Sequence, residues 1–234
     1  QIAMGAFAAS YFALYMNDMP MPVMLAVMIL AGMLAGGIWA LIPAFFKAQW
    51  GTNETIVTLM MNYIALKWVM FLQYGPWRDP KSLGFPKIAN FPKNAVIPKL
   101  LGVHMGWVFA LILVVAVYIF INHTKKGYEI AVIGESMNTA RYAGINIKKT
   151  ILIAIMLSGG LCGLVGMIQA SAVNGTLSVE ITGGVGYTAI ITAWLAALSA
   201  PLILIVSILF AALLEGGSYI QTVFGIPQAA AEIL

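Results

Sequence analysis

The chain has 234 residues, of which 62% are hydrophobic and 9% are charged. Ordinary soluble domains are about 45–50% apolar and about 25% charged, so this chain has too few charges to cover a water-exposed surface. Together with a mean hydropathy of +0.95, the composition excludes a soluble enzyme, a disordered tail and a nucleic-acid module. The sequence predicts an all-α fold, a polytopic bundle of transmembrane helices.

A membrane-spanning helix needs about 20 mostly apolar residues, and we expect six apolar segments of the sequence to be spans, the first of them truncated. A seventh apolar segment, 187–199, holds only 13 residues. At about 1.5 Å per residue it does not cross a ~30 Å core, so it is either a half-helix or borrows residues from the glycine-rich loop before it. We expect about six to eight spans, including this short or broken helix. The other spans are expected at about 1–16, 21–46, 55–73, 105–122, 150–172 and 201–222, with a break at 17–20.

The chain begins and ends in apolar sequence, and we expect residues 1–234 to be one transmembrane domain truncated at both ends. Small residues are spaced for close contact between its helices. Gly32 and Gly36 form one G-x-x-x-G pattern, and Gly159 and Gly163 form another, with Gly166 beyond. Such positions let helix backbones approach each other in lipid.

Two polar segments, 74–103 and 123–149, flank the span 105–122 and therefore lie on opposite sides of the membrane. The first contains five prolines, which forbid a regular helix. In membrane proteins the cytoplasmic segments usually carry more Lys and Arg than the segments outside. Here each segment carries five, so the count alone does not fix the orientation. Cations next to span ends weigh most in this rule, and we therefore expect 123–149 to be cytoplasmic and 74–103 to be extracellular. These cations are Lys47, Lys125, Lys126, Lys148 and Lys149.

Motifs for chemistry on this chain are missing from the sequence. It contains no G-x-x-x-x-G-K-[ST] phosphate loop and no Cys/His cluster with the spacing of a metal site. The two histidines, His104 and His123, are expected on opposite sides of the membrane. We therefore expect no catalytic residue, metal or cofactor on this chain, and no enzymatic activity of its own.

The segment 123–149 is amphipathic rather than loop-like. Glu135 to Ala143 is predicted to form a short helix, with Gly134 before it and Gly144 in the place of a C-terminal capping glycine. Its exposed face would carry Glu135, Asn138, Arg141 and Tyr142. Such a helix is suited to dock into a groove of another protein, and the alternative is a solvated connecting loop.

The stretch 133–169, IGESMNTARYAGINIKKTILIAIMLSGGLCGLVGMIQ, resembles the signature of integral membrane permeases of bacterial ABC importers, the family of ribose, branched-chain amino acid and nucleoside permeases. A loop of the form G-x-N/S-x-x-A-A-x-x-A/S-G-I precedes a span rich in small residues. The block 186–217 resembles the family's next block, with Ser199-Ala200-Pro201 in place of the usual Gly/Leu-Asn-Pro. The matching residues of the signature are Gly134, Ser136, Thr139, Ala140, Ala143, Gly144, Ile145, Ser158, Gly159, Gly163 and Gly166.

This resemblance implies a permease in a bacterial cytoplasmic membrane, with 123–149 as the loop that couples it to a cytoplasmic ATPase. It further implies a second permease chain, identical or different, an extracellular substrate-binding lipoprotein, and ATP-Mg on the partner subunits. The residues assigned to ATPase coupling are Gly134, Glu135, Ser136, Asn138, Ala140, Arg141, Tyr142, Ala143 and Gly144.

The block 53–80 is similar to permeases paired with lipoproteins of the basic membrane protein family, which are associated with nucleosides and simple sugars. The resemblance implies inward transport of such substrates. The matching residues are Asn53, Glu54, Thr58, Leu59, Asn62, Tyr63, Gly75, Pro76, Trp77, Arg78, Asp79 and Pro80.

Candidate pathway residues are Asn62, Trp194 and Glu215, because an amide and an aromatic ring suit ribose hydroxyls and a flat base. A helix–helix hydrogen bond is the alternative for Asn62, and a carboxylate at the membrane edge is the alternative for Glu215. Trp77, Arg78 and Asp79 are candidates for binding-protein docking, with a disordered linker as the alternative for 74–103.

The other function class left open is an ion-coupled secondary transporter or a channel-like protein. It would need ionisable groups inside the membrane to bind a coupling ion. Beyond Lys67, which lies within the expected span 55–73 and can extend toward the membrane surface, such groups are nearly missing from the sequence.

Overall fold

The computed structural model describes residues 1–16, 19–80, 82, 84, 86–100 and 102–224. The expected break at Asn17 and Asp18, and residues 81, 83, 85 and 101 of the expected extracellular segment, lie outside the described residues. The contacts divide the chain into two compact units. The first unit contains 1–111 and 120–183, and the second contains 112–119 and the chain from 184 onward.

The described residues are mainly helical, as the composition predicts. Five helices are long and apolar enough to cross a membrane, namely α2, α3, α4, α7 with its continuation η2, and α9. The all-α membrane bundle is therefore confirmed. The elements in chain order are α1 (Ile2–Tyr15), α2 (Met21–Trp50), α3 (Glu54–Tyr74), η1 (Lys93–Ala95), β1 (Lys99–Leu100), β2 (Val103–His104), α4 (Gly106–His123), α5 (Lys125–Glu135), α6 (Met137–Tyr142), α7 (Ile147–Ile168), η2 (Gln169–Asn174), α8 (Val185–Leu195) and α9 (Ala200–Phe224).

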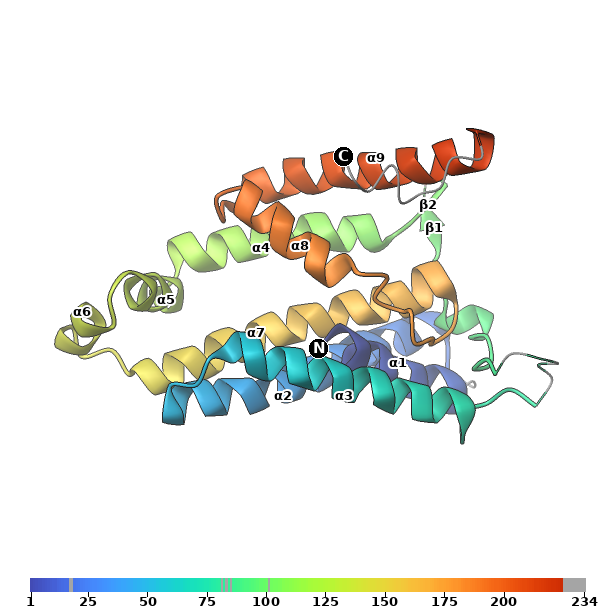
Figure 1. The fold of residues 1–234 in the computed structure, drawn as a ribbon, viewed down its shortest axis with the longest axis horizontal. Helices are drawn as coiled ribbons and strands as arrows, with labels where there is room; N and C mark the ends of the chain where they lie inside the picture. The colour runs from blue at the N-terminus through green and yellow to red at the C-terminus, as the bar shows by residue number, and fades with distance from the viewer. Residues whose placement is uncertain (17–18, 81, 83, 85, 101, 225–234) are drawn as a thin grey trace. The chain divides into compact units, whose positions relative to one another are not determined.

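The first unit is built on three closely packed helices, α1, α2 and α7 (Figure 1). A Cβ atom added to Gly163 of α7 would overlap the carbonyl oxygen of Gly32 in α2, and one added to Gly166 would overlap the carbonyl oxygen of Ile2 in α1. Only glycine permits this approach of backbones, which is how helices associate tightly in lipid. The predicted packing role of Gly159, Gly163 and Gly166 is thereby confirmed.

The core around these glycines consists of small and flexible side chains. Alanines of α1 lie fully buried against methionines of α2 and α7, which fill the irregular space between helices. The buried side chains that define this core are Ala6, Ala9, Ala13, Met24, Met28 and Met167.

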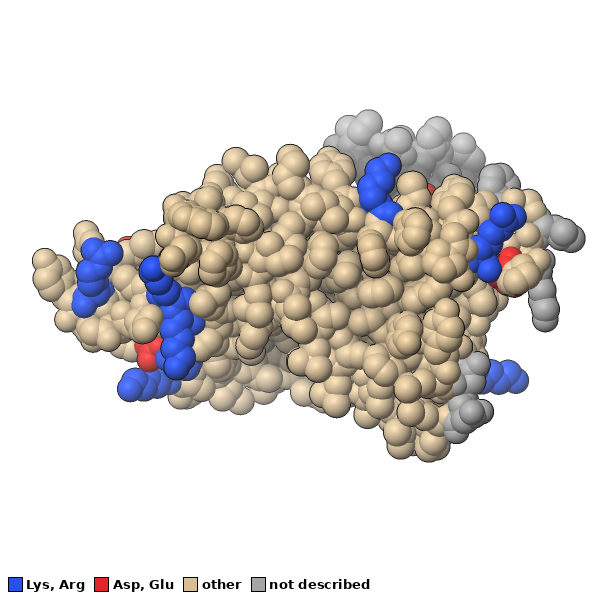
Figure 2. All heavy atoms as spheres, turned by 90° about the horizontal axis from the view of Figure 1, so that it is seen from below, with Lys and Arg blue, Asp and Glu red and all other residues tan. Residues whose placement is uncertain are grey.

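The helix α2 extends four residues beyond its predicted end at 46. It stops at Trp50 because Gly51 adopts the left-handed conformation, with φ of 65°, and its amide donates to the Lys47 carbonyl. This is a common way for a helix to end, and glycine adopts it without steric cost. On the face shown in Figure 2, most of the Lys, Arg, Asp and Glu side chains lie toward the two ends, and one basic side chain lies between them on a surface that is otherwise uncharged.

The first unit has two distinct ends. The α6 end contains residues 47–54 and 124–150, and the loop end contains the described residues of 73–105 together with 169–183. Figure 1 shows α5 and α6 at one end and the hairpin of β1 and β2 at the other. In this hairpin, Lys99 pairs with His104 and Leu100 pairs with Val103, in antiparallel register.

The second unit contains α8, α9 and the middle of α4. The helix α8 has 11 residues, or about 16 Å at 1.5 Å per residue, and is too short to cross a bilayer by itself. This supports the half-helix alternative for 187–199. Between α8 and α9, Ala197 and Leu198 take positive φ values of 48° and 58°, an uncommon conformation for residues other than glycine.

Candidate functional site

The segment predicted to couple to a partner forms two helices that meet at Ser136. Thr124 caps the start of α5, because its hydroxyl accepts from the amide of Gly127 at 3.0 Å. Ser136 has extended backbone, ends α5, and accepts from the amide of Thr139 at 3.3 Å, which starts α6. A serine hydroxyl satisfies a free amide at a helix start better than it fits a helix interior.

The predicted helix 135–143 is therefore wrong at its beginning. Gly134 and Glu135 belong to the last turn of α5, and α6 begins at Met137. The predicted end is confirmed, because Gly144 has a φ of 70° and donates to the Arg141 carbonyl at 3.1 Å. Ile145 donates to the Ala140 carbonyl at 3.0 Å, which completes a Schellman motif.

Most residues assigned to ATPase coupling lie on the surface of the α6 end. Tyr142 is 94% exposed, which is far above the usual exposure of a large aromatic side chain. Ala140 faces inward and is fully buried, and Ser136 is half-buried. The exposed members are Gly134, Glu135, Asn138, Arg141, Tyr142, Ala143 and Gly144.

The helix α5 is attached to α7 through a carboxylate that the sequence analysis did not single out. Glu129 is 9% exposed, and its Oε2 accepts from Lys126 Nζ at 2.5 Å and from Thr150 Oγ1 at 3.1 Å. The hydrogen bond from Lys126 lowers the pKa of Glu129, and the bond from Thr150 adds to this, while burial opposes both. The pairing of Lys126 with Glu129 can be predicted from sequence, because residues three positions apart are neighbours on a helix. The contact between Glu129 and Thr150 cannot be predicted in this way, because Thr150 lies on a different helix.

Polar contacts join three chain segments at the α6 end. Lys47 of α2 pairs with Glu54 of α3 at 2.6 Å, and Lys148 of α7 donates to Gln49 of α2 at 2.9 Å. Asn53 caps α3 by accepting from the amide of Thr55 at 2.9 Å. The expectation that Lys47 and Lys148 lie on the same side is therefore confirmed.

At the loop end, the proline-rich segment is held by side chains from α3 and from the continuation of α7. Gln73 donates to the Pro86 carbonyl at 2.9 Å and accepts from the amide of Val179 at 3.2 Å. Ser171, on the π-helical turn η2, donates to the Ala95 carbonyl at 2.5 Å and accepts from the amide of Ile97 at 3.1 Å. The irregular backbone thus has the partners that buried polar groups require.

Further bonds close this end of the unit. Thr176 donates to the Ile88 carbonyl at 3.0 Å, and the amide of Phe91 donates to the Gly175 carbonyl at 2.8 Å. Ile88 is fully buried, so the segment contributes to the core of the unit. The described part of 74–103 is therefore packed against the core and is not the disordered linker that was the alternative.

The docking candidates Trp77, Arg78 and Asp79 have different environments. Trp77 is half-buried and stacks on Phe7 of α1, with ring centroids 5.3 Å apart and planes inclined by 20°. The Asp79 amide donates to the Lys87 carbonyl at 2.8 Å. Arg78 is the exposed member of the three, so it is the side chain open to a partner.

The pathway candidates lie in different units and remain separate candidates. Asn62 is half-buried on α3 in the first unit. Trp194 is 73% exposed on α8, and Glu215 is exposed on α9. Lys67 is exposed on α3, as expected for a lysine that extends toward the membrane surface.

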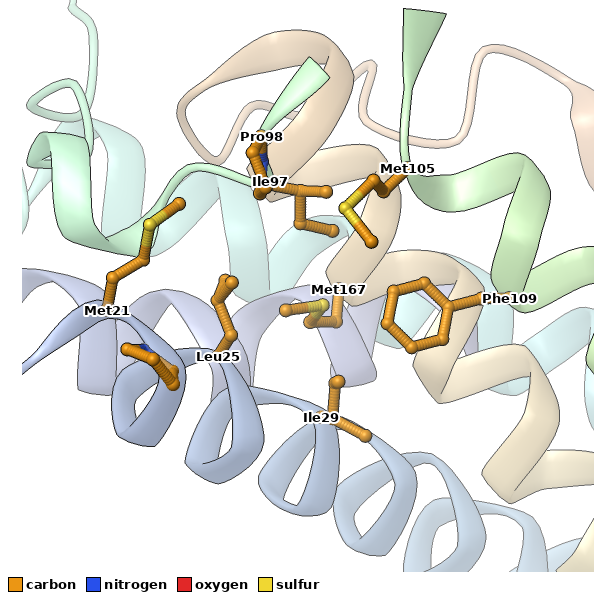
Figure 3. Close-up of a pocket in the computed structure, with 9 residues that line it drawn as sticks. Met21, Leu25, Ile29, Ile97, Pro98, Met105, Phe109 and Met167 are labelled. Atoms are coloured by element: carbon orange, nitrogen blue, oxygen red, sulfur yellow. The ribbon is translucent and has the colours of Figure 1, made fainter. Parts of the chain in front are cut away.

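A cavity of about 240 Å³ lies within the first unit, at the start of α2 and the end of α7 (Figure 3). Its lining includes Leu25, Ile97, Met105, Phe109 and Met167, and no lining side chain is polar. A hydroxyl-rich ligand would find no side-chain hydrogen-bond partner there, so this cavity is a poor substrate site. Within the described residues, no group of three His, Cys, Asp or Glu side chains is placed to hold a metal ion.

Comparison with known proteins identifies the relatives of this chain. The glucose ABC transporter permease protein of Haloferax volcanii is 32% identical over 100% of this chain and 64% of its own length. The guanosine ABC transporter permease protein of Bacillus subtilis is 28% identical over 93% of this chain and 64% of its own. The nucleoside ABC transporter permease protein of Lactococcus lactis is 27% identical over 100% of this chain and 67% of its own.

The chain therefore spans about two thirds of the length of these curated relatives. No solved structure matches the chain. The sequence model of the family described as "Branched-chain amino acid transport system / permease component" matches residues 1–234. Because this match covers every residue, the chain belongs to that family of membrane permeases.

Proposed function

We propose that this chain is part of the permease subunit of an ABC importer that moves nucleosides or related simple sugars inward across the cytoplasmic membrane. Separate cytoplasmic ATPase subunits, which bind ATP-Mg, would supply the energy. A second permease chain, identical or different, would complete the pore, and an extracellular lipoprotein would deliver substrate. The chain itself would catalyse no reaction.

The observation that carries this proposal is the exposed surface of α6. This short helix presents Arg141 and the 94% exposed Tyr142 at the end of the unit where cations adjoin the helix ends. Buried aromatic and arginine side chains dominate binding energy at protein interfaces, so an exposed pair of this kind suits a protein partner. We assign the α6 end to the cytoplasm and the loop end to the outside.

The substrate class is supported by the relatives, whose names include glucose, guanosine and nucleoside transport. Asn62 and Trp194 are the proposed substrate contacts, through an amide hydrogen bond and ring stacking. Asn62→Ala and Trp194→Ala should each raise the substrate concentration needed for half-maximal uptake. Unchanged affinity and rate in both variants would remove these residues from the pathway.

The decisive experiment is uptake by proteoliposomes that contain the full-length protein with its neighbouring permease, ATPase and binding lipoprotein. Labelled nucleosides are compared with ribose-type sugars, with and without ATP. ATP-dependent nucleoside uptake is expected. ATP-dependent sugar uptake would keep the mechanism and change the substrate, and uptake driven by an ion gradient without ATP would refute the proposed mechanism.

Two variants test the coupling surface within that system. Reversal of charge in Arg141→Glu and added bulk in Gly144→Leu should separate ATP hydrolysis from uptake while the protein remains inserted. At Gly144 a side chain is also disfavoured by the φ of 70°. Normal coupling in both variants would exclude α6 as the contact with the ATPase.

Docking of the lipoprotein is proposed to involve the loop end. Because residues 86–98 are fastened to the core, a deletion there would disturb the unit as well as any docking surface. The exposed Arg78 offers a sharper test. Arg78→Glu should weaken lipoprotein binding in a pull-down with the intact permease, whereas unaltered binding would count against docking at this residue.

A further inference from the structure

Glu129 occupies an unusual place for a carboxylate. It belongs to the polar helix α5, yet it is 9% exposed, whereas the neighbouring Tyr128 is 66% exposed. Buried carboxylates need partners, because an unpaired charge away from water is costly. Here both partners, Lys126 Nζ at 2.5 Å and Thr150 Oγ1 at 3.1 Å, reach the same oxygen, Oε2.

The two partners have different structural consequences. Lys126 lies on α5 itself, so the ion pair holds the Glu129 side chain in one orientation on its own helix. Thr150 is on the first turns of α7 and is 2% exposed. Its hydroxyl therefore ties α5, the helix before α6, to the membrane-spanning helix that follows α6, in addition to the chain link 143–146.

The helix α7 is suited to pass a displacement on to the rest of the unit. Its glycines bring its backbone against the backbones of α1 and α2, and added Cβ atoms at Gly159, Gly163 or Gly166 would overlap neighbouring atoms. Closely packed helices of this kind move together rather than deform independently. A force applied to α7 at Thr150 would therefore act on α1 and α2 as well.

We propose that Glu129 is a positioning residue for energy coupling, which transmits displacement of α6 by the cytoplasmic partner through Thr150 to α7. This inference rests on the proposed function. The path runs from α6, across the cap at Ser136, along α5 to Glu129, and then into α7. Without the contact between Glu129 and Thr150, α6 would still bind its partner, but its movement would reach α7 through the link 143–146 alone and therefore less completely.

The test uses the full-length, assembled transporter in proteoliposomes and measures substrate uptake and ATP hydrolysis in the same preparation. Glu129→Ala and Thr150→Val should each lower the number of substrate molecules transported per ATP by about tenfold, within the usual range of coupling between sites. Hydrolysis itself should continue. Because the two residues act through one contact, the double variant should be no worse than either single variant.

Conservative and control variants separate positioning from mere structural support. Glu129→Gln keeps an oxygen that accepts from Thr150 and should restore most of the coupling. Lys149→Ala changes an exposed side chain next to Thr150 and should have no effect on the ratio. The thermal midpoint of each purified complex shows whether a variant has changed coupling or has only destabilised the protein.

Three outcomes would overturn the inference. These are an unchanged transport ratio in Glu129→Ala, equal losses of uptake and hydrolysis, or additive losses in the double variant. Failure of the unmodified complex to show any ATP-driven uptake would be a different result. It would refute the proposed function itself, and the inference about Glu129 with it.

Discussion

The loop end and the α6 end of the first unit are built in opposite ways. The loop end has mostly irregular backbone, but Gln73, Ser171 and Thr176 fasten it to the core. The α6 end is helical, but α6 leaves Arg141 and Tyr142 in solvent. Regular secondary structure and attachment to the core are therefore separate properties, and the loosely attached helix is the better candidate for a moving contact.

The largest loss of stability is expected from a substitution in the packed helices α2 and α7, because these helices support both ends of the unit. Gly163→Val would place a branched side chain against the backbone of Gly32 and force α2 and α7 apart. We expect a loss of stability at or above the ~3 kcal/mol upper range typical of overpacking. The yield of folded protein in detergent and its thermal midpoint measure this loss.

Gly134→Val is the matched control for that substitution. An added Cβ at Gly134 meets nothing within 4 Å, so the fold should be retained. Equal yields and midpoints for the two variants would mean that α2 and α7 do not require the close approach seen at Gly163.

The second effect concerns the loop end alone. Ser171→Ala removes the acceptor for the amide of Ile97 and the donor to the carbonyl of Ala95, both of which are buried. Leaving such groups unsatisfied costs about 1–3 kcal/mol. Hydrogen exchange should accelerate across 86–98 and remain unchanged in α5 and α6.

Ser158→Ala serves as the control, since Ser158 is an exposed serine on the neighbouring helix α7. It should leave both the stability and the exchange pattern intact. Faster exchange at the α6 end in Ser171→Ala would show that the two ends are not independent.

The sequence predicts the membrane-spanning helices more successfully than the contacts and boundaries between neighbouring elements. Long apolar runs and G-x-x-x-G spacing are local signals, so α2, α3, α4, α7 and α9 lie close to their predicted places. Gly144 also lies where a capping glycine is expected. These features depend on the residues of one helix or one turn.

The missed features depend on partners distant in sequence. Ser171 and Ala95 are 76 positions apart, and Thr150 and Glu129 are 21 apart. No pattern within either segment indicates these pairs, because serine, threonine and glutamate have many other uses on a surface. The predicted start of α6 is wrong for a different reason, since Ser136 both ends α5 and caps α6.

A third prediction addresses the attachment of α6. Ser136→Ala removes the hydroxyl that accepts from the amide of Thr139. Loss of a serine cap costs about 1 kcal/mol, and because α6 has few other supports the effect should be local. Amide exchange should rise in 137–142, whereas the thermal midpoint of the whole protein should change little.

Ser136→Asp provides the rescue, because a carboxylate also accepts from the first amides of a helix. Exchange in α6 should return toward that of the unmodified protein. An identical rise in Ser136→Asp would indicate that the hydroxyl is needed for something other than capping.

The smallest effect on the fold is expected for Tyr142→Ala, and this variant separates the two ends most clearly. Because Tyr142 is 94% exposed, its loss should change stability by no more than ~0.5 kcal/mol. Transport by the proposed importer should nevertheless fall, since tyrosine is enriched among the interface residues whose truncation weakens binding by about 2 kcal/mol or more. Tyr128→Ala, at an exposed tyrosine of α5, should change neither quantity. If Tyr142→Ala lowered the thermal midpoint and left transport intact, α6 would be a structural element like the loop end rather than a contact with the ATPase.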